Sequence, residues 1–299
     1  MEQNARGRAA RGESVSKYTK AAGIIILLYV IALLAAAPLP QGNVAVLHID
    51  GVLDTSRHTD GTSSARVVDQ LDALSGNPAI RGLIIEVDSP GGSGVAAWEI
   101  AQAVKRLNIT RVAVIRGVGA SGGYWVASAT DHVIASPFSI VGSIGVTSSY
   151  LEISQLLQHY GITYNEITSG TYKDMGSPFK QLAPDEEVLL RQAVQQAQQS
   201  FVAAVAQNRH MTESTVESLA DGRIFLGDEA LSLGLIDEIG TQTDAVAYLE
   251  SQLNSTVITY ELPTDTWYEL LSQGMATRLG KGIGQGFATG LLAQASIKT

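Results

Sequence analysis

The sequence has no cysteine among its 299 residues, and only 16% of them are charged. Without cysteine the chain can form no disulfide framework, no thiolate zinc site and no cysteine nucleophile. A hydrophobic content of 45% together with so little charge excludes a disordered chain and a coiled coil. The net charge of −9 argues against a nucleic-acid partner, because phosphate backbones attract basic surfaces. What remains is a globular chain with one large or two small domains.

The N-terminus combines a basic tail with an uncharged apolar segment. Residues 1–20 carry more basic than acidic side chains, whereas residues 21–37 carry no charge. Such a segment spans about 25 Å as a helix, near the short limit for a bilayer core of roughly 30 Å. The pattern predicts a cytoplasmic basic tail (1–20), a single-pass transmembrane signal anchor (21–37) and a body on the extracytoplasmic side of the cell membrane. Two alternatives remain open: a signal peptide cleaved after the small residues 35–37, which also places the body outside, and a buried core helix.

The body alternates apolar runs that are typical of strands with segments of helical periodicity. Residues 80–87 form a β-branched run without polar alternation, which is typical of a strand buried on both faces. The same criteria predict further strands at residues 43–49, 111–116, 132–135, 162–167 and 256–260, and helices at 97–107, at 124–129 and from Pro184 past residue 205. This order predicts an α/β fold with mainly parallel strands, in a domain over residues 42–260. Residues 261–299 are predicted to form a C-terminal helix and a glycine-rich tail.

The sequence GASGG at residues 119–123 is the strongest candidate for a catalytic centre. Its serine, Ser121, follows a buried strand, lies between glycines and opens a helix. A substrate carbonyl can approach such a hydroxyl, and unpaired N–H groups at the helix start can stabilise an oxyanion. The spacing also fits the G-x-S-x-G nucleophile elbow of α/β-hydrolases. The alternative is a tight strand–helix turn in which Ser121 merely caps the helix.

A second glycine-containing turn, DSPGG at residues 88–92, follows the predicted strand at 80–87. Its two glycines expose consecutive N–H groups at the carboxyl edge of a parallel sheet, where such folds bind their ligands. The turn can supply an oxyanion donor and can pair with an extended peptide. Alternatively, it is an ordinary turn before a helix that Ser93 caps.

A nucleophilic serine needs a general base, and the sequence offers histidines or a lysine. None of the five histidines lies in a motif, and only His210 suits the order serine, acid, histidine of the hydrolases. His48 and His132 fall inside predicted strands. A lysine base must be neutral near neutral pH and therefore desolvated. Lys173, in a loop of small residues, is the candidate, and a surface lysine paired with a carboxylate is the alternative.

Five motifs in order resemble the signal peptide peptidase A family of membrane-bound serine proteases. They are DSPGG, GASGGYW, GSIGV, SGTYKDMGSPF and GRIFLGDEALSLGLIDEIG, at residues 88–92, 119–125, 142–146, 169–179 and 222–240. The resemblance covers about residues 43–250 and implies a Clp-protease/crotonase-like fold of repeated β-β-α units. It implies a Ser121–Lys173 dyad in place of a triad, with Ser143 orienting the base. It also implies homo-oligomers around an axial cavity, and oxyanion donors from Gly91 or Gly92 and from Gly122.

These observations together predict a membrane-anchored serine endopeptidase that hydrolyses membrane-derived peptides, such as cleaved signal peptides, without a metal or an organic cofactor. Its partners are then peptide substrates, the membrane and further copies of the chain. We expect Ser121 Oγ and Lys173 Nζ to lie within about 3.5 Å of each other in the folded protein. The alternatives are a histidine-dependent esterase of the α/β-hydrolase type and a catalytically silent membrane scaffold.

Overall fold

The computed structural model describes Leu27, residues 42–57 and residues 59–262. One compact unit begins at Asn43 and contains the sheet. The predicted basic tail and signal anchor lie outside the described residues, apart from Leu27, as does the predicted C-terminal tail after Leu262. Within the described part of the chain, no helix is both long and apolar enough to cross a membrane.

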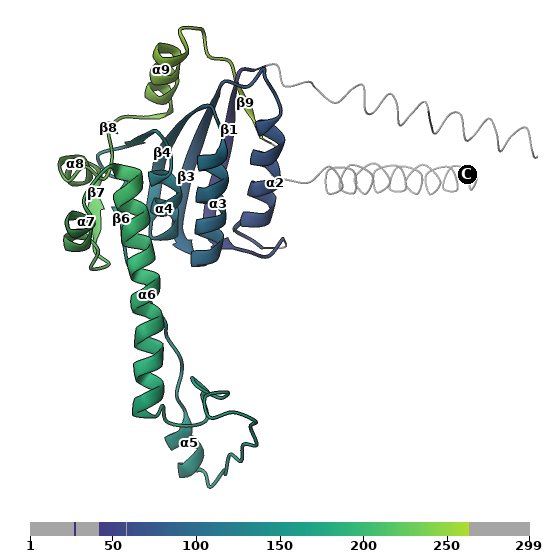
Figure 1. Ribbon diagram of the computed structural model, residues 1–299, viewed down its shortest axis with the longest axis vertical. Helices are drawn as coiled ribbons and strands as arrows, with labels where there is room; N and C mark the ends of the chain where they lie inside the picture. The colour runs from purple at the N-terminus through teal and green to yellow at the C-terminus, as the bar shows by residue number, and fades with distance from the viewer. Residues whose placement is uncertain (1–26, 28–41, 58, 263–299) are drawn as a thin grey trace, which may run out of the picture. The chain divides into compact units, whose positions relative to one another are not determined.

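A mainly parallel sheet forms the centre of this unit (Figure 1). Its continuous path runs β2-β1-β3-β4-β5-β8, while β9 pairs with β1 and β6 pairs with β4. The pairing of β6 with β7 is antiparallel. The strands are β1 (Val44–Asp54), β2 (Thr62–Ser63), β3 (Gly82–Gly92), β4 (Thr110–Ala120), β5 (His132–Ala135), β6 (Ile140–Gly142), β7 (Ile224–Leu226), β8 (Glu238–Ile239) and β9 (Thr259–Glu261). The prediction of an α/β fold with mainly parallel strands is therefore confirmed.

The long central strand β4 has two successive neighbours on one side. Its first half, Val112–Ile115, pairs with β5, and its last residues, Val118–Ala120, pair with β6. On its other side β4 pairs with β3, whose residues 82–87 are all buried, as the unbroken apolar run predicts. The carboxyl ends of β3, β4 and β6 therefore meet at one edge of the sheet.

Helices cover both faces of the sheet. They are α2 (Ser64–Ser75), α3 (Gly94–Arg106), α4 (Gly122–Ser128), α5 (Ser154–His159), α6 (Pro184–Arg209), α7 (Glu213–Leu219), α8 (Gly227–Ser232) and α9 (Gln242–Leu253). On one face, α2, α3 and α4 enclose the larger apolar core. On the other face, Ala245 and Leu249 of α9 pack against alternate residues of β1, β3, β4 and β5.

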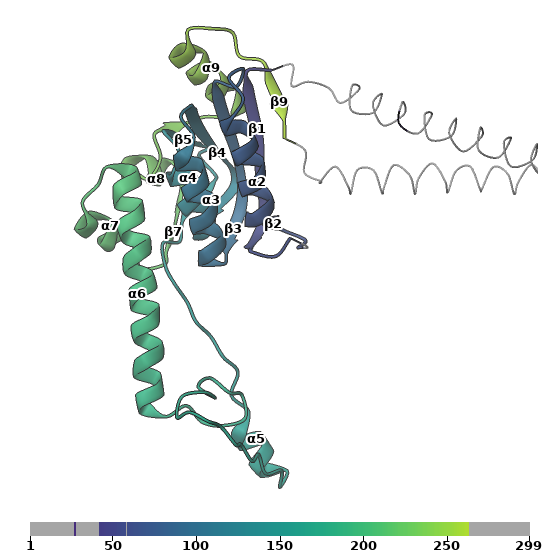
Figure 2. The same cartoon turned by 45° about the vertical axis from the view of Figure 1, so that its right-hand side comes forward.

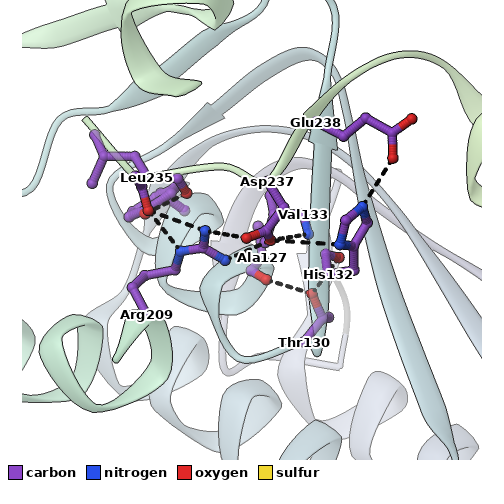
Figure 3. A network of polar contacts seen from close by, with 10 residues as sticks. Ala127, Thr130, His132, Val133, Arg209, Leu235, Asp237 and Glu238 are labelled. Atoms are coloured by element: carbon purple, nitrogen blue, oxygen red, sulfur yellow. Dashed lines mark hydrogen bonds and ion pairs between the residues drawn. The ribbon is translucent and has the colours of Figure 1, made fainter. Parts of the chain in front are cut away.

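Helix α6 is fixed at its C-terminal end. Phe201 stacks on Trp125 of α4 with ring centroids 4.7 Å apart. The Arg209 side chain, only 7% exposed, donates to Asp237 at 2.7 Å and 2.8 Å and to the Gly234 carbonyl, and Asp237 also accepts the Val133 N–H (Figure 3). Burial raises the pKa of the Asp237 carboxyl, but Arg209 outweighs burial and holds this pKa below its ordinary value. This end of α6 is thus tied to β5 and to the loop before β8.

The N-terminal half of α6 extends away from the sheet. Between Glu186 and Phe201 the helix has no buried residue. The chain between β6 and α6, residues 146–183, which we call the arm, runs to the far end of α6 in both views (Figures 1 and 2). The predicted strand at residues 162–167 is wrong: this part of the arm is exposed and pairs with no described strand. The apolar side chains of residues 162–167 are therefore not explained by burial in the sheet.

Candidate functional site

Ser121 lies at the carboxyl end of β4, directly before α4. Its φ of +51° is strained for a residue with a side chain. Its N–H donates to the Gly142 carbonyl at 2.8 Å, and its own carbonyl accepts the Trp125 N–H at 3.0 Å. Ser121 occupies the N-cap position of α4, as the alternative interpretation predicts, but its side chain makes no capping hydrogen bond, so capping does not account for its hydroxyl. Its hydroxyl has no partner among the described residues and is available as a nucleophile.

The DSPGG segment forms the bulged end of β3 and packs directly against this serine. Gly91 has a φ of +96°, and a Cβ placed on it would lie 2.8 Å from Ser121 Cβ and 2.7 Å from the Gly122 nitrogen. Only glycine therefore allows the two segments to approach so closely. The Gly91 N–H already donates to Ser89 Oγ at 3.1 Å, whereas Gly92 is exposed. Of the two glycines, Gly92 is thus the better placed to meet a ligand.

Ser93 follows β3 and caps α3, accepting the Ala96 N–H at 3.4 Å. The predicted cap is therefore confirmed, whereas the predicted turn is wrong, because residues 88–92 continue β3 and Gly91 and Gly92 pair with Val52 and Leu53 of β1. The cap does not compete with a role at the site, because it uses Ser93 while the exposed backbone belongs to Gly92.

Ser143 is a neighbour of Ser121 across the sheet. Gly142 of β6 pairs in register with Ala120 of β4, so the two serines follow the ends of adjacent strands, which lie about 4.8 Å apart. The Ser143 N–H donates to the Arg223 carbonyl at 2.8 Å, and its φ is also positive, at +49°. No described residue is hydrogen-bonded to the Ser143 hydroxyl. The structure thus brings Ser121, Ser143 and the two glycine segments together.

Lys173 is not at this site in a single chain. It is exposed, and it lies in a turn of the arm in which its N–H donates to the Gly170 carbonyl at 3.1 Å. The arm meets α6 at Pro184, about 25 Å along the helix from Phe201, which packs beside α4. The expected contact between Ser121 Oγ and Lys173 Nζ is therefore not formed within one chain.

The strand that holds Ser121 also shows how far His132 is from it. His132 begins β5 opposite Val112, nine residues before Ser121, which is about 30 Å along β4. Its ring stacks on Tyr248 at 4.1 Å and pairs with Glu238 at 3.0 Å (Figure 3). His132 is a packed residue at the opposite edge of the sheet, as its place in a predicted strand indicated.

The other described histidines are equally unsuited to act on Ser121. His48 in the middle of β1 is hydrogen-bonded to Glu261 at 2.8 Å, and His210 ends α6 beside Arg209 and Asp131. His159 is exposed at the end of α5 on the arm, and His58 lies outside the described residues. Among the residues that the structure describes, no histidine base stands beside Ser121. No group of three or more histidine and carboxylate side chains in the same part of the chain is placed to hold a metal ion.

The chemistry available at the site is that of a nucleophile without its base. A strained serine with a free hydroxyl lies next to the exposed backbone of Gly92 and the helix start at Gly122, an arrangement that suits acyl transfer. Among the described residues of one chain, no group is placed to take the proton from Ser121. The sequence motifs predict Ser121, Ser143 and the two glycine segments as parts of one site, whereas no local pattern in the sequence signals that Lys173 lies apart from them within one chain.

Comparisons with known proteins agree with this chemistry. The sequence profile of peptidase family S49 matches residues 103–256, and the profile of Clp protease matches residues 44–141. A protein of Methanocaldococcus jannaschii described as a protease is 34% identical, over 73% of this chain and 72% of the relative. A protein of Enterococcus faecium described as a signal peptide peptidase is 36% identical, over 65% of this chain and 58% of the relative.

A chloroplast serine protease of Arabidopsis thaliana is 30% identical, over 63% of this chain but only 28% of the relative. The chain thus spans less than two thirds of the length of two of these three relatives. The two profile matches together extend from β1 to the end of α9 and include Ser121, Ser143 and Lys173.

Proposed function

We propose, since the chain belongs to peptidase family S49 and is a serine endopeptidase, that its active site combines Ser121 of one copy with Lys173 of another. The observation that carries this proposal is the free, strained Ser121 beside the glycine segments, with Lys173 exposed on an arm that leads away from it. We further propose that the enzyme is anchored in the cell membrane by residues 21–37, with its catalytic domain on the extracytoplasmic side.

The proposed reaction proceeds through an acyl-enzyme. The neutral Lys173 amine takes the proton of Ser121 as Oγ attacks the peptide carbonyl, and the resulting ammonium gives the proton to the leaving amine. The N–H groups of Gly92 and Gly122 stabilise the oxyanion, and the Ser143 hydroxyl orients the lysine. A water molecule, deprotonated by the same lysine, then hydrolyses the ester and frees Ser121.

The surface of the arm supports a second copy as its partner. Ile167 is fully exposed, and Leu151 and Tyr160 are 73% and 70% exposed. Further apolar residues of the arm and of α6, among them Tyr150 and Leu190, line a groove between these two elements. Apolar surface of this extent marks an interface. Contact with a second copy would also cover Lys173, and a lysine base needs such desolvation.

The proposed substrates are apolar peptides left in the membrane, such as cleaved signal peptides. Val52, Val95 and Trp98 are each more than half exposed, and Val52 borders Gly92. An extended apolar peptide that pairs with the DSPGG segment would meet these side chains. One relative, that of Enterococcus faecium, is itself described as a signal peptide peptidase.

Complementation between two inactive variants tests the shared site. We expect the Ser121→Ala and Lys173→Ala variants to be inactive when each is expressed alone. Their co-expressed mixture should recover about a quarter of the wild-type activity, because one site in four then pairs an intact serine with an intact lysine. Hydrolysis of a peptide ester by doubly tagged, purified hetero-oligomers measures this recovery. The matched control co-expresses Ser121→Ala with the double variant Ser121→Ala/Lys173→Ala and should show no activity. A mixture of the two single variants that stays inactive, although it purifies as a hetero-oligomer, would contradict a site shared between copies.

Removal of the anchor tests the membrane proposal. A chain that begins at Gln41 should be soluble and active on a small peptide ester, because every proposed catalytic residue follows Pro40. The full chain should instead sediment with phospholipid vesicles, and the truncated chain should not. Light scattering of the active truncated protein should give an oligomer. If the truncated chain also sediments with vesicles, residues 21–37 are not the anchor. If the truncated chain is an active monomer of about 30 kDa, the proposal of a site shared between two copies is wrong.

A further inference from the structure

The arm contains a second lysine whose contacts differ from those of Lys173. Lys180 Nζ lies 2.5 Å from Asp174 Oδ2 and 2.8 Å from Glu186 Oε1. The Glu186 side chain is only 3% exposed, and its other carboxylate oxygen accepts the Ala183 N–H at the start of α6. Lys180 therefore joins the turn that contains Asp174 to the first turn of α6.

Both chain neighbours of Lys173 lie at this end of α6. Asp174 is held through Lys180, and the Asp185 carboxyl of α6 raises the pKa of the nearby Tyr172 hydroxyl. The Glu166 carboxyl lies beside Asp174 as well. Lys173 directly precedes the held Asp174, while its own side chain is exposed and has no partner among the described residues. The backbone at Lys173 is therefore held near the start of α6, while its side-chain amine makes no hydrogen bond to a described residue.

The carboxylates of this cluster keep Lys180 protonated, which distinguishes it from Lys173, the proposed base. Hydrogen bonds to Asp174 and to Glu186 hold the pKa of Lys180 above its ordinary value, so this lysine keeps its proton. The hydrogen bond from Glu166 and that from Lys180 lower the pKa of the Asp174 carboxyl. A lysine that stays charged cannot serve as a general base, which leaves Lys180 a structural role.

Helix α6 connects this cluster to the sheet and to the helices that cover it. Its 26 residues span about 39 Å. At the far end from the cluster, Phe201 stacks on Trp125 of α4, the helix that begins after Ser121, and Arg209 is locked to Asp237. The helix is thus a stiff connector between the nucleophile's helix and the Lys173 turn of the same chain.

We propose that Lys180 is a positioning residue for the peptidase reaction, which locks the Lys173 turn onto the start of α6 and so presents the Lys173 amine to Ser121 of the neighbouring copy. The inference rests on the proposed function, because it takes Lys173 as the base. Misplacing a catalytic group by about 1 Å can lower a rate about 100-fold, which sets the size of the effect.

Three variants of the full chain test this role. We expect Lys180→Met to lower kcat for a peptide ester about 100-fold with KM changed less than about threefold, because the base moves while the peptide site stays intact. Lys180→Arg should restore most of kcat, since a guanidinium can bridge both carboxylates. The control is Arg106→Met, which removes a cation paired with the Asp72 carboxylate at 3.2 Å between α3 and α2, away from α6 and the arm, and should leave kcat unchanged.

The outcomes distinguish this inference from the proposed function. If Lys173→Met is inactive while Lys180→Met has wild-type kcat, only the role of Lys180 is wrong. If Lys173→Met is active, the proposed function itself is wrong. Light scattering measures the oligomeric state of each variant. If Lys180→Met loses its oligomeric state together with its activity, Lys180 is needed for assembly and the positioning role is overturned. Asp174→Asn, which keeps the side chain's shape but removes its charge, should lower kcat in the same direction by a smaller factor.

Discussion

Replacing Lys173 with arginine is expected to abolish acylation of Ser121 as completely as replacing it with alanine. Arginine keeps the length and the positive charge of the side chain, but its guanidinium cannot lose a proton in the working pH range. A general base contributes about 100- to 10,000-fold to such a step, so both variants should lose at least about 100-fold in kcat/KM. The rate of labelling by a fluorophosphonate probe measures acylation of Ser121 directly.

Variants of two histidines are the controls for this prediction. His132→Ala removes a ring stacked on Tyr248, and His210→Ala changes the end of α6, so both should lower the thermal stability. Neither should change the labelling rate of the folded protein by more than a few-fold, because both residues lie far from Ser121 along the sheet. A Lys173→Ala enzyme with near-wild-type turnover, together with an inactive histidine variant, would replace the dyad with a histidine-dependent hydrolase.

The sheet and the nucleophile could be predicted because their signals are local. The apolar run at 80–87 requires a strand buried on both faces, and β3 has this form. The glycines around Ser121 permit a close strand–helix connection, and in the structure β4 passes into α4 directly at Ser121. The apolar run that follows His132 likewise predicts a strand, and His132 begins β5.

The arm could not be predicted, because its fold is set by partners that lie outside the local sequence. Residues 162–167 have the apolar composition of a strand, but no described strand pairs with them and Ile167 is fully exposed. Composition shows that a side chain avoids water and does not show whether the same chain or a second copy covers it. The contact of Lys180 with Asp174 and Glu186 likewise cannot be predicted from hydrophobic periodicity, since it joins a turn to the end of a helix.

Replacing Gly91 with alanine is expected to inactivate the enzyme with little loss of structure. The added methyl group would lie 2.8 Å from Ser121 Cβ and 2.7 Å from the Gly122 nitrogen, so either the nucleophile or the DSPGG segment must move. A displacement of about 1 Å at the reacting atoms lowers the rate about 100-fold. The φ of +96° adds a backbone cost of about 1 kcal/mol, which should appear as a lower unfolding temperature.

Gly94→Ala is the matched control, three residues further along the same segment. Gly94 lies in the first turn of α3 without a positive φ, and a Cβ there has no atom within 4 Å. Alanine favours a helix over glycine, so the unfolding temperature should stay the same or rise while the labelling rate of Ser121 is unchanged. The contrast isolates the contact with Ser121 from the general effect of adding a methyl group. Equal labelling rates for Gly91→Ala and Gly94→Ala would show that the DSPGG segment does not hold the nucleophile in place, and the assignment of this edge of the sheet as the active site would lose its geometric basis.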